Sequence, residues 1–125
     1  EAVVHARAAY ERMIVLSGAK QRSTLNVRKT LALALAELGK LDEAEAHAEA
    51  ILATVRVTPV GDEGLVLKCL AAVAHLRSKR GDYAAAEELA REVAERTIAL
   101  HGARSTETAR ELGNWGAALA RLGRI

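Results

Sequence analysis

The chain repeats itself at a fixed interval, and this recurrence limits the folds that it can adopt. The turn signal Leu-Gly-Lys-Leu at 38–41 returns as Arg-Gly-Asp-Tyr at 80–83 and as Leu-Gly-Arg-Ile at 122–125. The spacing of the glycines is the same both times, 81 − 39 = 42 and 123 − 81 = 42. A second signal, Leu-Ser-Gly-Ala-Lys at 16–20, returns as Leu-His-Gly-Ala-Arg at 100–104, an offset of two periods (100 − 16 = 84). Such a period is typical of arrays in which each repeat is one supersecondary unit.

Each of these glycines suits the end of a helix. A helix ends most easily when the next residue takes a left-handed conformation, which glycine adopts without a clash of Cβ. The following helix then needs a side chain that accepts a hydrogen bond at its N-cap. The candidate N-caps are Ser23 or Thr24, Asp42 with Glu45 as a capping box, Asp62, Asp82 and Ser105. These signals predict helices over residues 2–17, 24–38, 42–57, 63–80, 83–101 and 106–122.

Composition favours the same all-α fold class. Half of the residues are hydrophobic but only 2% are aromatic, so Leu, Val, Ile and Ala must build the core. The single proline, Pro59, falls between two predicted helices, where it cannot break either one. Apolar residues recur at helical spacing: Leu31, Ala34, Leu35 and Leu38; Ala44, Ala48, Ile51 and Leu52; Val66, Leu70, Val73 and Ala74; Ala86, Ala90, Val93 and Ala94. No stripe of this kind can be buried within its own helix, so neighbouring helices must stack.

The residues around the turns resemble those of the tetratricopeptide repeat (TPR) family. That family shows a large apolar residue, a Leu-Gly or small pair, an aromatic residue or Leu, and then Gly-x-Tyr-x-x-Ala. The matching residues are Leu31, Ala32, Leu35, Gly39, Leu41, Ala44 and Ala48; Leu70, Val73, Ala74, Gly81, Tyr83, Ala86 and Ala90; and Leu112, Trp115, Gly116, Leu119 and Gly123. The usual TPR period is about 34 residues. The longer period and the Leu-x-Gly-Ala corner make the chain similar to the kinesin-light-chain subtype, which is common in multidomain bacterial signalling proteins.

The resemblance implies an α-α superhelix, or TPR solenoid, of about six antiparallel helices in a single domain. In its register, residues 1–20 form half a repeat, 21–62 and 63–104 form complete repeats, and 105–125 form half a repeat. We therefore expect the chain to be a fragment of a larger bacterial repeat protein.

Side chains that could carry catalysis do not converge in the sequence. The four histidines, His5, His47, His75 and His101, fall in four predicted helices, and no pair has the spacing of metal ligands. Cys69 is the only cysteine and lies in an apolar run, so we expect a small buried side chain. The acidic pairs at 42–43 and 87–88 lie near helix starts, where they favour the helix dipole. We expect no enzymatic activity, no cofactor and no metal.

Net charge and hydropathy indicate which class of partner and which cellular location to expect. The net charge of +2 comes from 18 Lys and Arg against 16 Asp and Glu, which is a weak bias for a nucleic-acid binder. Nucleic acid therefore ranks last among the partners. We expect no membrane association, because the sequence has no apolar run of the length that spans a bilayer. No signal peptide opens the chain, so we expect a cytoplasmic location.

In TPR arrays the first helix of each pair lines a concave groove, and the resemblance carries this role to positions of this chain. The positions expected to bind a peptide are Asn26, Lys29, Leu33, Lys68, His75, Lys79, Arg110, Asn114 and Arg121. Five of these are Lys or Arg, and Glu37 is the one acidic residue at the expected groove positions. The resemblance therefore predicts a mildly basic groove that suits an acidic protein or peptide. The alternative is that these cations are solvated side chains with no ligand.

Some TPR proteins grip a C-terminal carboxylate with a set of Lys, Asn and Arg side chains. Lys29, Arg110 and Asn114 match parts of that set. Leu33 and Ala72 stand where the set has Asn, so we do not assign a carboxylate clamp.

The alternative function is self-association through open terminal helices. Residues 2–17 and 105–122 would then pair with copies of themselves. We expect Trp115 to lie in the inter-helix core, and a part of it to be exposed as an apolar patch only if no helix follows.

Overall fold

The computed structural model describes residues 3–9, 22–57 and 62–123, and every regular element among them is an α-helix. Residues 3–9 are helical, and they are followed by α2 (Arg22–Glu37), α3 (Leu41–Val57), α4 (Glu63–Lys79), α5 (Tyr83–His101) and α6 (Thr106–Arg121). The predicted all-α fold class is confirmed. The rest of the helix predicted over 2–17, the corner at Gly18 and the turn around Pro59 lie outside the described residues.

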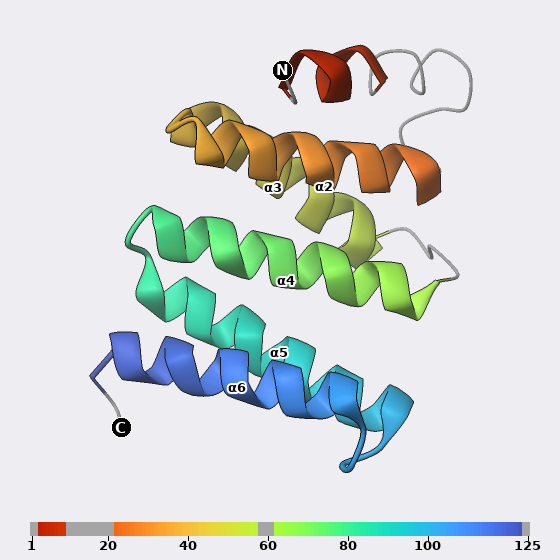
Figure 1. Ribbon diagram of the computed structural model, residues 1–125, viewed down its shortest axis with the longest axis vertical. Helices are drawn as coiled ribbons and strands as arrows, with labels where there is room; N and C mark the ends of the chain where they lie inside the picture. The colour runs from red at the N-terminus through yellow and green to blue at the C-terminus, as the bar shows by residue number, and fades with distance from the viewer. Residues whose placement is uncertain (1–2, 10–21, 58–61, 124–125) are drawn as a thin grey trace.

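The helices are stacked in two rows along the long axis of the molecule (Figure 1). Helices α2, α4 and α6 lie in front and run in one direction, while α3 and α5 lie behind them and run the opposite way. Each helix packs against the next in the chain, and α2 also packs against α4. Sequence-distant helices are thereby brought onto one face.

Two polar contacts fix how the front helices line up. Nζ of Lys79 in α4 lies 3.3 Å from Oε1 of Glu37 in α2, and the two positions are one period apart (79 − 37 = 42). Nη1 of Arg121 in α6 donates to Oγ of Ser78 in α4 over 3.0 Å, which is one position more than a period (121 − 78 = 43). Positions that are one period apart, or one residue from that offset, are therefore in contact between neighbouring front helices.

The corners after α2 and α4 have the same geometry. Gly39 and Gly81 have φ values of +79° and +85°, the left-handed conformation expected of them. The hydrogen bonds that close the corners, each 2.9 Å long, run from N–H to carbonyl: Lys40 to Leu35, and Asp82 to Arg77. This is the Schellman arrangement, which satisfies carbonyls at the end of a helix. The two bonds are offset by the same period as the glycines (82 − 40 = 42), so the sequence recurrence is also a recurrence of backbone structure.

Three of the predicted N-caps are confirmed. The side chains of these residues accept hydrogen bonds from backbone N–H groups three residues later: Asp62 from Leu65 (3.1 Å), Asp82 from Ala85 (3.2 Å) and Ser105 from Thr108 (3.0 Å).

The other two predicted caps are wrong. Helix α3 begins at Leu41, so Asp42 lies inside its first turn, and its carboxylate pairs with Arg80 at 3.0 Å. The capping box does not form because Glu45 pairs with Arg77 of α4. Helix α2 begins at Arg22, so Ser23 and Thr24 also lie inside the helix rather than before it.

The core lies between the two rows. Its largest fully buried side chains are Leu25, Leu31, Leu35, Ile51, Leu70, Val73, Leu76 and Val93. Burial of one such side chain stabilises the fold by roughly 1.5–3 kcal/mol. Fully buried Ala32, Ala48 and Ala94 take up little room, which lets the rows approach closely. Leu38 departs from its predicted stripe and is 52% exposed, because α2 ends one residue before it.

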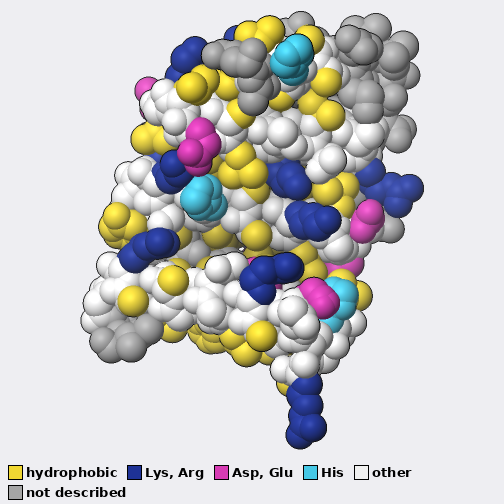
Figure 2. All heavy atoms as spheres, in the orientation of Figure 1, with side chains coloured by type: hydrophobic (Ala, Val, Ile, Leu, Met, Phe, Trp, Pro, Cys, Tyr) yellow, Lys and Arg dark blue, Asp and Glu magenta, His cyan; other side chains and the backbone are white. Residues whose placement is uncertain are grey.

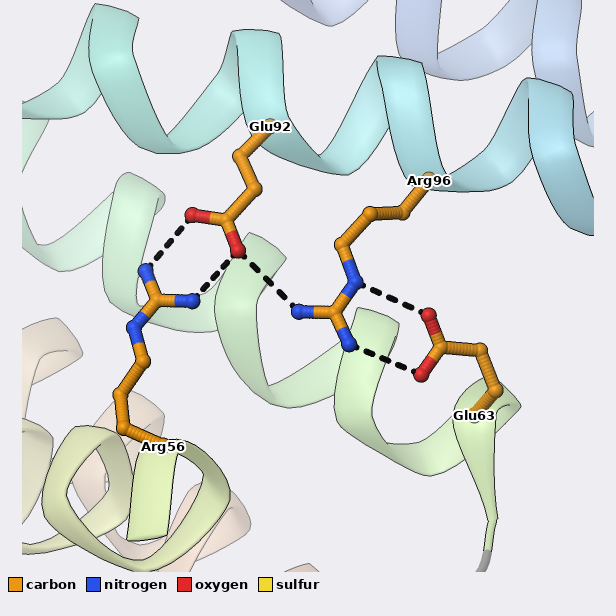
Figure 3. Close-up of polar contacts among 4 residues, drawn as sticks. All are labelled: Arg56, Glu63, Glu92 and Arg96. Carbon is orange, nitrogen blue, oxygen red and sulfur yellow. Dashed lines mark hydrogen bonds and ion pairs between the residues drawn. The ribbon is translucent and has the colours of Figure 1, made fainter.

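An ion-pair network joins α3, α4 and α5 (Figure 3). Arg56 of α3 binds Glu92 of α5 with both terminal nitrogens, and the Nη2–Oε1 bond is 2.6 Å. Arg96 donates to the same Glu92 over 3.1 Å and to Glu63 of α4 through two bonds of 2.9 Å. The hydrogen bond from Arg56, supported by the charge of Arg96, holds the pKa of Glu92 below its ordinary value. Three helices are thus tied together by paired, directional contacts.

Candidate binding groove

A groove of about 640 Å³ lies on the face formed by α2, α4 and α6. Side chains of Lys and Arg are spread over this face (Figure 2). Six of the positions predicted to bind a peptide line the groove: Lys29, Leu33, Lys68, His75, Arg110 and Asn114. The first and the last of these belong to different repeats and lie far apart in the sequence. The alternation of front and back helices is what brings them together.

A smaller cavity of about 230 Å³ adjoins the groove between α4 and α6 and reaches α5. It shares Ala71, His75, Glu111 and Asn114 with the groove. Small side chains from all three helices leave this space open: Ala71 and Ala74, Ala86 and Ala90, and Ala117 and Ala118. The cavity therefore has an apolar wall and a polar edge.

The remaining predicted positions lie elsewhere on the same face. Arg121 lines the smaller cavity rather than the groove. Asn26 lines a separate depression of about 380 Å³ beside Lys68. Lys79 lines neither the groove nor the cavity, and its ammonium group pairs with Glu37 of α2. The structure therefore brings Arg121 to the site and leaves Asn26 and Lys79 at its margin.

Glu111 is one of the groove residues, with Glu107 and His101, that the sequence did not predict. It is 8% exposed, and it lines both the groove and the cavity. Its carboxylate accepts hydrogen bonds from Nε of Arg110 at 3.0 Å and from Nδ2 of Asn114 at 3.1 Å. The signal that could have revealed it is the recurrence, because the equivalent residues one and two periods earlier are the apolar Cys69 and Val27.

The groove is lined by equal numbers of basic residues (Lys and Arg) and acidic residues, whereas a mildly basic lining was predicted. Lys29, Lys68 and Arg110 are joined by the acidic Glu37, Glu107 and Glu111. Glu37 and Glu111 are neutralised by Lys79 and Arg110. Within the described part of the chain, Lys29 and Lys68 form no ion pair, so their charges remain available to a ligand.

Trp115 joins α6 to α5 through a polar contact. Its Nε1 donates a hydrogen bond of 2.8 Å to Oε2 of Glu87, which is 5% exposed. The indole is half-buried, so the expected core position is met in part. The interpretation of Glu87 as a carboxylate that favours the helix dipole is wrong, because Glu87 lies beyond the first turn of α5 and is held by Trp115.

The thiol of Cys69 lies in the core of the described stack. Cys69 is fully buried, as expected, and burial raises the pKa of its thiol to about 11. Residues 3–9, 22–57 and 62–123 contain no group of three His, Cys, Asp or Glu side chains that could hold a metal ion.

Length and apolar character together decide whether a helix can cross a bilayer. None of the helices in the described ranges is both long enough and apolar enough to span a membrane.

The sequence was compared with protein-family models and with curated protein sequences. The sequence matches no protein-family model and no curated protein sequence.

Proposed function

We propose that the chain is a TPR-like array of the kinesin-light-chain-like type that binds an acidic segment of another protein. Helix pairs with recurring Schellman corners and aligned front helices support the repeat assignment. The proposal includes a cytoplasmic scaffold role without catalysis, as expected from the sequence.

The observation that carries the proposal is the groove across the front helices. Lys29 of α2 and Lys68 of α4 line it and form no ion pair with another described residue. The same groove is lined by Leu33, which offers an apolar contact. An extended peptide can meet such a surface with carboxylates at the cations and apolar side chains between them.

The test measures binding of fluorescein-labelled peptides rich in Asp and Glu by fluorescence anisotropy. Lys29→Glu and Lys68→Glu reverse charges that have no ion-pair partner within the described part of the chain, so the fold should be preserved. Each reversal is expected to weaken binding about tenfold, and the wild-type affinity should fall as salt is raised.

The matched control is Arg91→Glu, which reverses an exposed charge of α5 that lines neither the groove nor the cavity. It should leave the affinity within about twofold of the wild type. If all three reversals changed binding equally, only the overall charge would be involved and the groove assignment would be wrong.

Self-association is the second candidate, and one comparison favours it. Leu112 of α6 is 40% exposed, whereas the equivalent Leu70 of α4 is fully buried beneath the rest of the stack. Half-buried Trp115 and Leu119 continue the same side of α6. Light scattering over a range of concentrations tests pairing of this face with a second copy. A mass that stays at one chain up to millimolar concentration would exclude it, and a mass that rises should be reduced by Leu112→Glu.

A further inference from the structure

Residues one period apart on neighbouring front helices can be compared by charge, and the pair α2 and α4 differs in this respect from the pair α4 and α6. Along α2 and α4, the equivalent residues are Asn26 beside Lys68 and Glu37 beside Lys79. Along α4 and α6, they are Lys68 beside Arg110 and Lys79 beside Arg121, each one period apart (110 − 68 = 42 and 121 − 79 = 42). At these positions, α2 and α4 carry opposite charges or one neutral residue, whereas α4 and α6 carry like charges. The positions of Lys68 with Arg110 and of Lys79 with Arg121 are called the two places below.

The packing follows this difference. Glu37 and Lys79 form an ion pair at 3.3 Å, and α2 packs directly against α4. Between α4 and α6 lie the cavity and the part of the groove that these two helices line. Arg121, which has Lys79 as its neighbour in register, donates to the hydroxyl of Ser78. Lys79 is neutralised by Glu37, whereas Lys68 and Arg121 form no ion pair with another described residue. An anion that lies between α4 and α6 would therefore stabilise Lys68 and Arg110 at one place and Arg121 at the other.

We infer that the partner segment carries two carboxylates, one for each place, in an extended backbone that lies along the groove between α4 and α6. This inference rests on the proposed function and specifies the ligand of the same site. One carboxylate would meet Lys68 and Arg110, and the other would meet Arg121. Arg110 uses its Nε for Glu111, and its side chain remains 64% exposed, so its outer nitrogens are accessible.

The spacing of the two carboxylates follows from helix geometry. Arg110 and Arg121 are separated by 121 − 110 = 11 positions on α6, which corresponds to roughly 16 Å at a rise of about 1.5 Å per residue. An extended peptide advances about 3.3 Å per residue. The two acidic residues should therefore be about five positions apart in the partner.

The residues between the two acids should be uncharged or apolar. Glu111 and Asn114 line both the groove and the cavity, and neither offers a positive charge to a third anion. The alanine-lined cavity of about 230 Å³ has room for an apolar side chain. A nucleic acid, with a phosphate at every residue, would place negative charge next to Glu111 and Glu107.

The experiment selects binders from a randomised dodecapeptide library displayed on phage, with the whole chain as bait. The expected result is enrichment of Asp or Glu pairs about five positions apart over all other separations. An enriched peptide is then compared with an isomer in which the second acid is moved to two positions from the first. The isomer should bind about tenfold more weakly, because it loses one charge-assisted contact.

Variants connect the spacing to the two places on the protein. Lys68→Gln and Arg121→Gln should each weaken the five-spaced peptide about tenfold, whereas Arg91→Gln should not. The two-spaced isomer should respond to only one of the variants Lys68→Gln and Arg121→Gln. Circular dichroism of every variant, compared with the wild type, verifies that the helices are retained.

The possible failures are distinguishable. If no peptide is enriched, the proposed function itself is wrong. If peptides are enriched without preferred acid spacing, or with spacing that Arg121→Gln does not affect, the two-carboxylate inference is overturned while the peptide-binding function stands. A short oligothymidine that bound more tightly than the best peptide, and that lost affinity in the same variants, would overturn the choice of a peptide.

Discussion

The indole of Trp115 in α6 donates a hydrogen bond of 2.8 Å to the buried carboxylate of Glu87 in α5. At the equivalent place one repeat earlier, Glu45 of α3 is paired with the guanidinium of Arg77 in α4. The second repeat therefore joins its neighbouring helix by a neutral donor where the first uses a cation. The contact between Trp115 and Glu87 therefore depends on the indole N–H.

Trp115→Phe is expected to lower the free energy of unfolding by about 1–3 kcal/mol. Phenylalanine keeps an aromatic ring at this half-buried position, but the Glu87 carboxylate loses this donor, and a buried acceptor without a partner is costly. Urea unfolding followed by circular dichroism gives the value. A double-mutant cycle with Glu87→Met, which removes the acceptor at similar volume, isolates the hydrogen bond, and a coupling energy near zero would contradict its contribution.

Leu70→Ala is expected to lower the free energy of unfolding by about 2–5 kcal/mol. Leu70 is fully buried in α4, so its loss leaves a cavity that the surrounding helices only partly close. The control is Leu112→Ala, the same substitution at the equivalent position of α6, where the side chain is 40% exposed. It should cost no more than about 1 kcal/mol. Equal losses in the two variants would mean that α6 is covered in solution.

Most of the fold is encoded locally, and this is why it could be predicted. The corner at Gly81 depends on one left-handed residue, and the cap at Asp82 depends on one side chain three residues from its donor. Such signals can be read within a few positions of the sequence. The start of α3 is an exception, because the tight corner at Gly39 begins the helix before the expected cap at Asp42.

The site was harder to predict because it depends on contacts between distant helices. The front-helix positions follow from the register of the repeat, which is why Lys68 and His75 do line the groove. The partners of side chains do not follow from it. Lys79 is occupied by Glu37, and Glu111 enters the groove at a position that is apolar in the preceding helices. Neither contact can be predicted without knowing which helices lie side by side.

Gly81→Ala is expected to lower the free energy of unfolding by about 1 kcal/mol or more. Gly81 has a φ of +85°, which an alanine adopts only with strain. The control is Gly113→Ala in the interior of α6, where an added Cβ would meet nothing within 4 Å. That substitution should instead stabilise the chain by about 0.5–1 kcal/mol, because alanine favours helix. Thermal unfolding of both variants measures the difference, and the same sign for both would contradict the left-handed corner.

Glu92→Gln should lower the free energy of unfolding at pH 7 by on the order of 1 kcal/mol and have a smaller effect at pH 3. Arg56 and Arg96 lower the pKa of Glu92 in the folded chain, with the bond from Arg56 as the largest cause. The unfolded chain therefore binds a proton at this carboxyl first as the pH falls below about 4.5. The stabilisation is fully present above that pH and is lost as the pH falls through the lower folded pKa.

Urea unfolding at pH 7, 4.5 and 3 measures this dependence in the wild type and in Glu92→Gln. The matched control is Glu95→Gln on the same helix, a carboxylate that forms no ion pair with another residue in the described ranges. It should change the free energy of unfolding by less than about 0.5 kcal/mol at each pH. If Glu92→Gln were equally destabilising at pH 7 and pH 3, the contribution of Glu92 would come from packing. The charged network that joins α3, α4 and α5 would then not stabilise the fold through its ionised form.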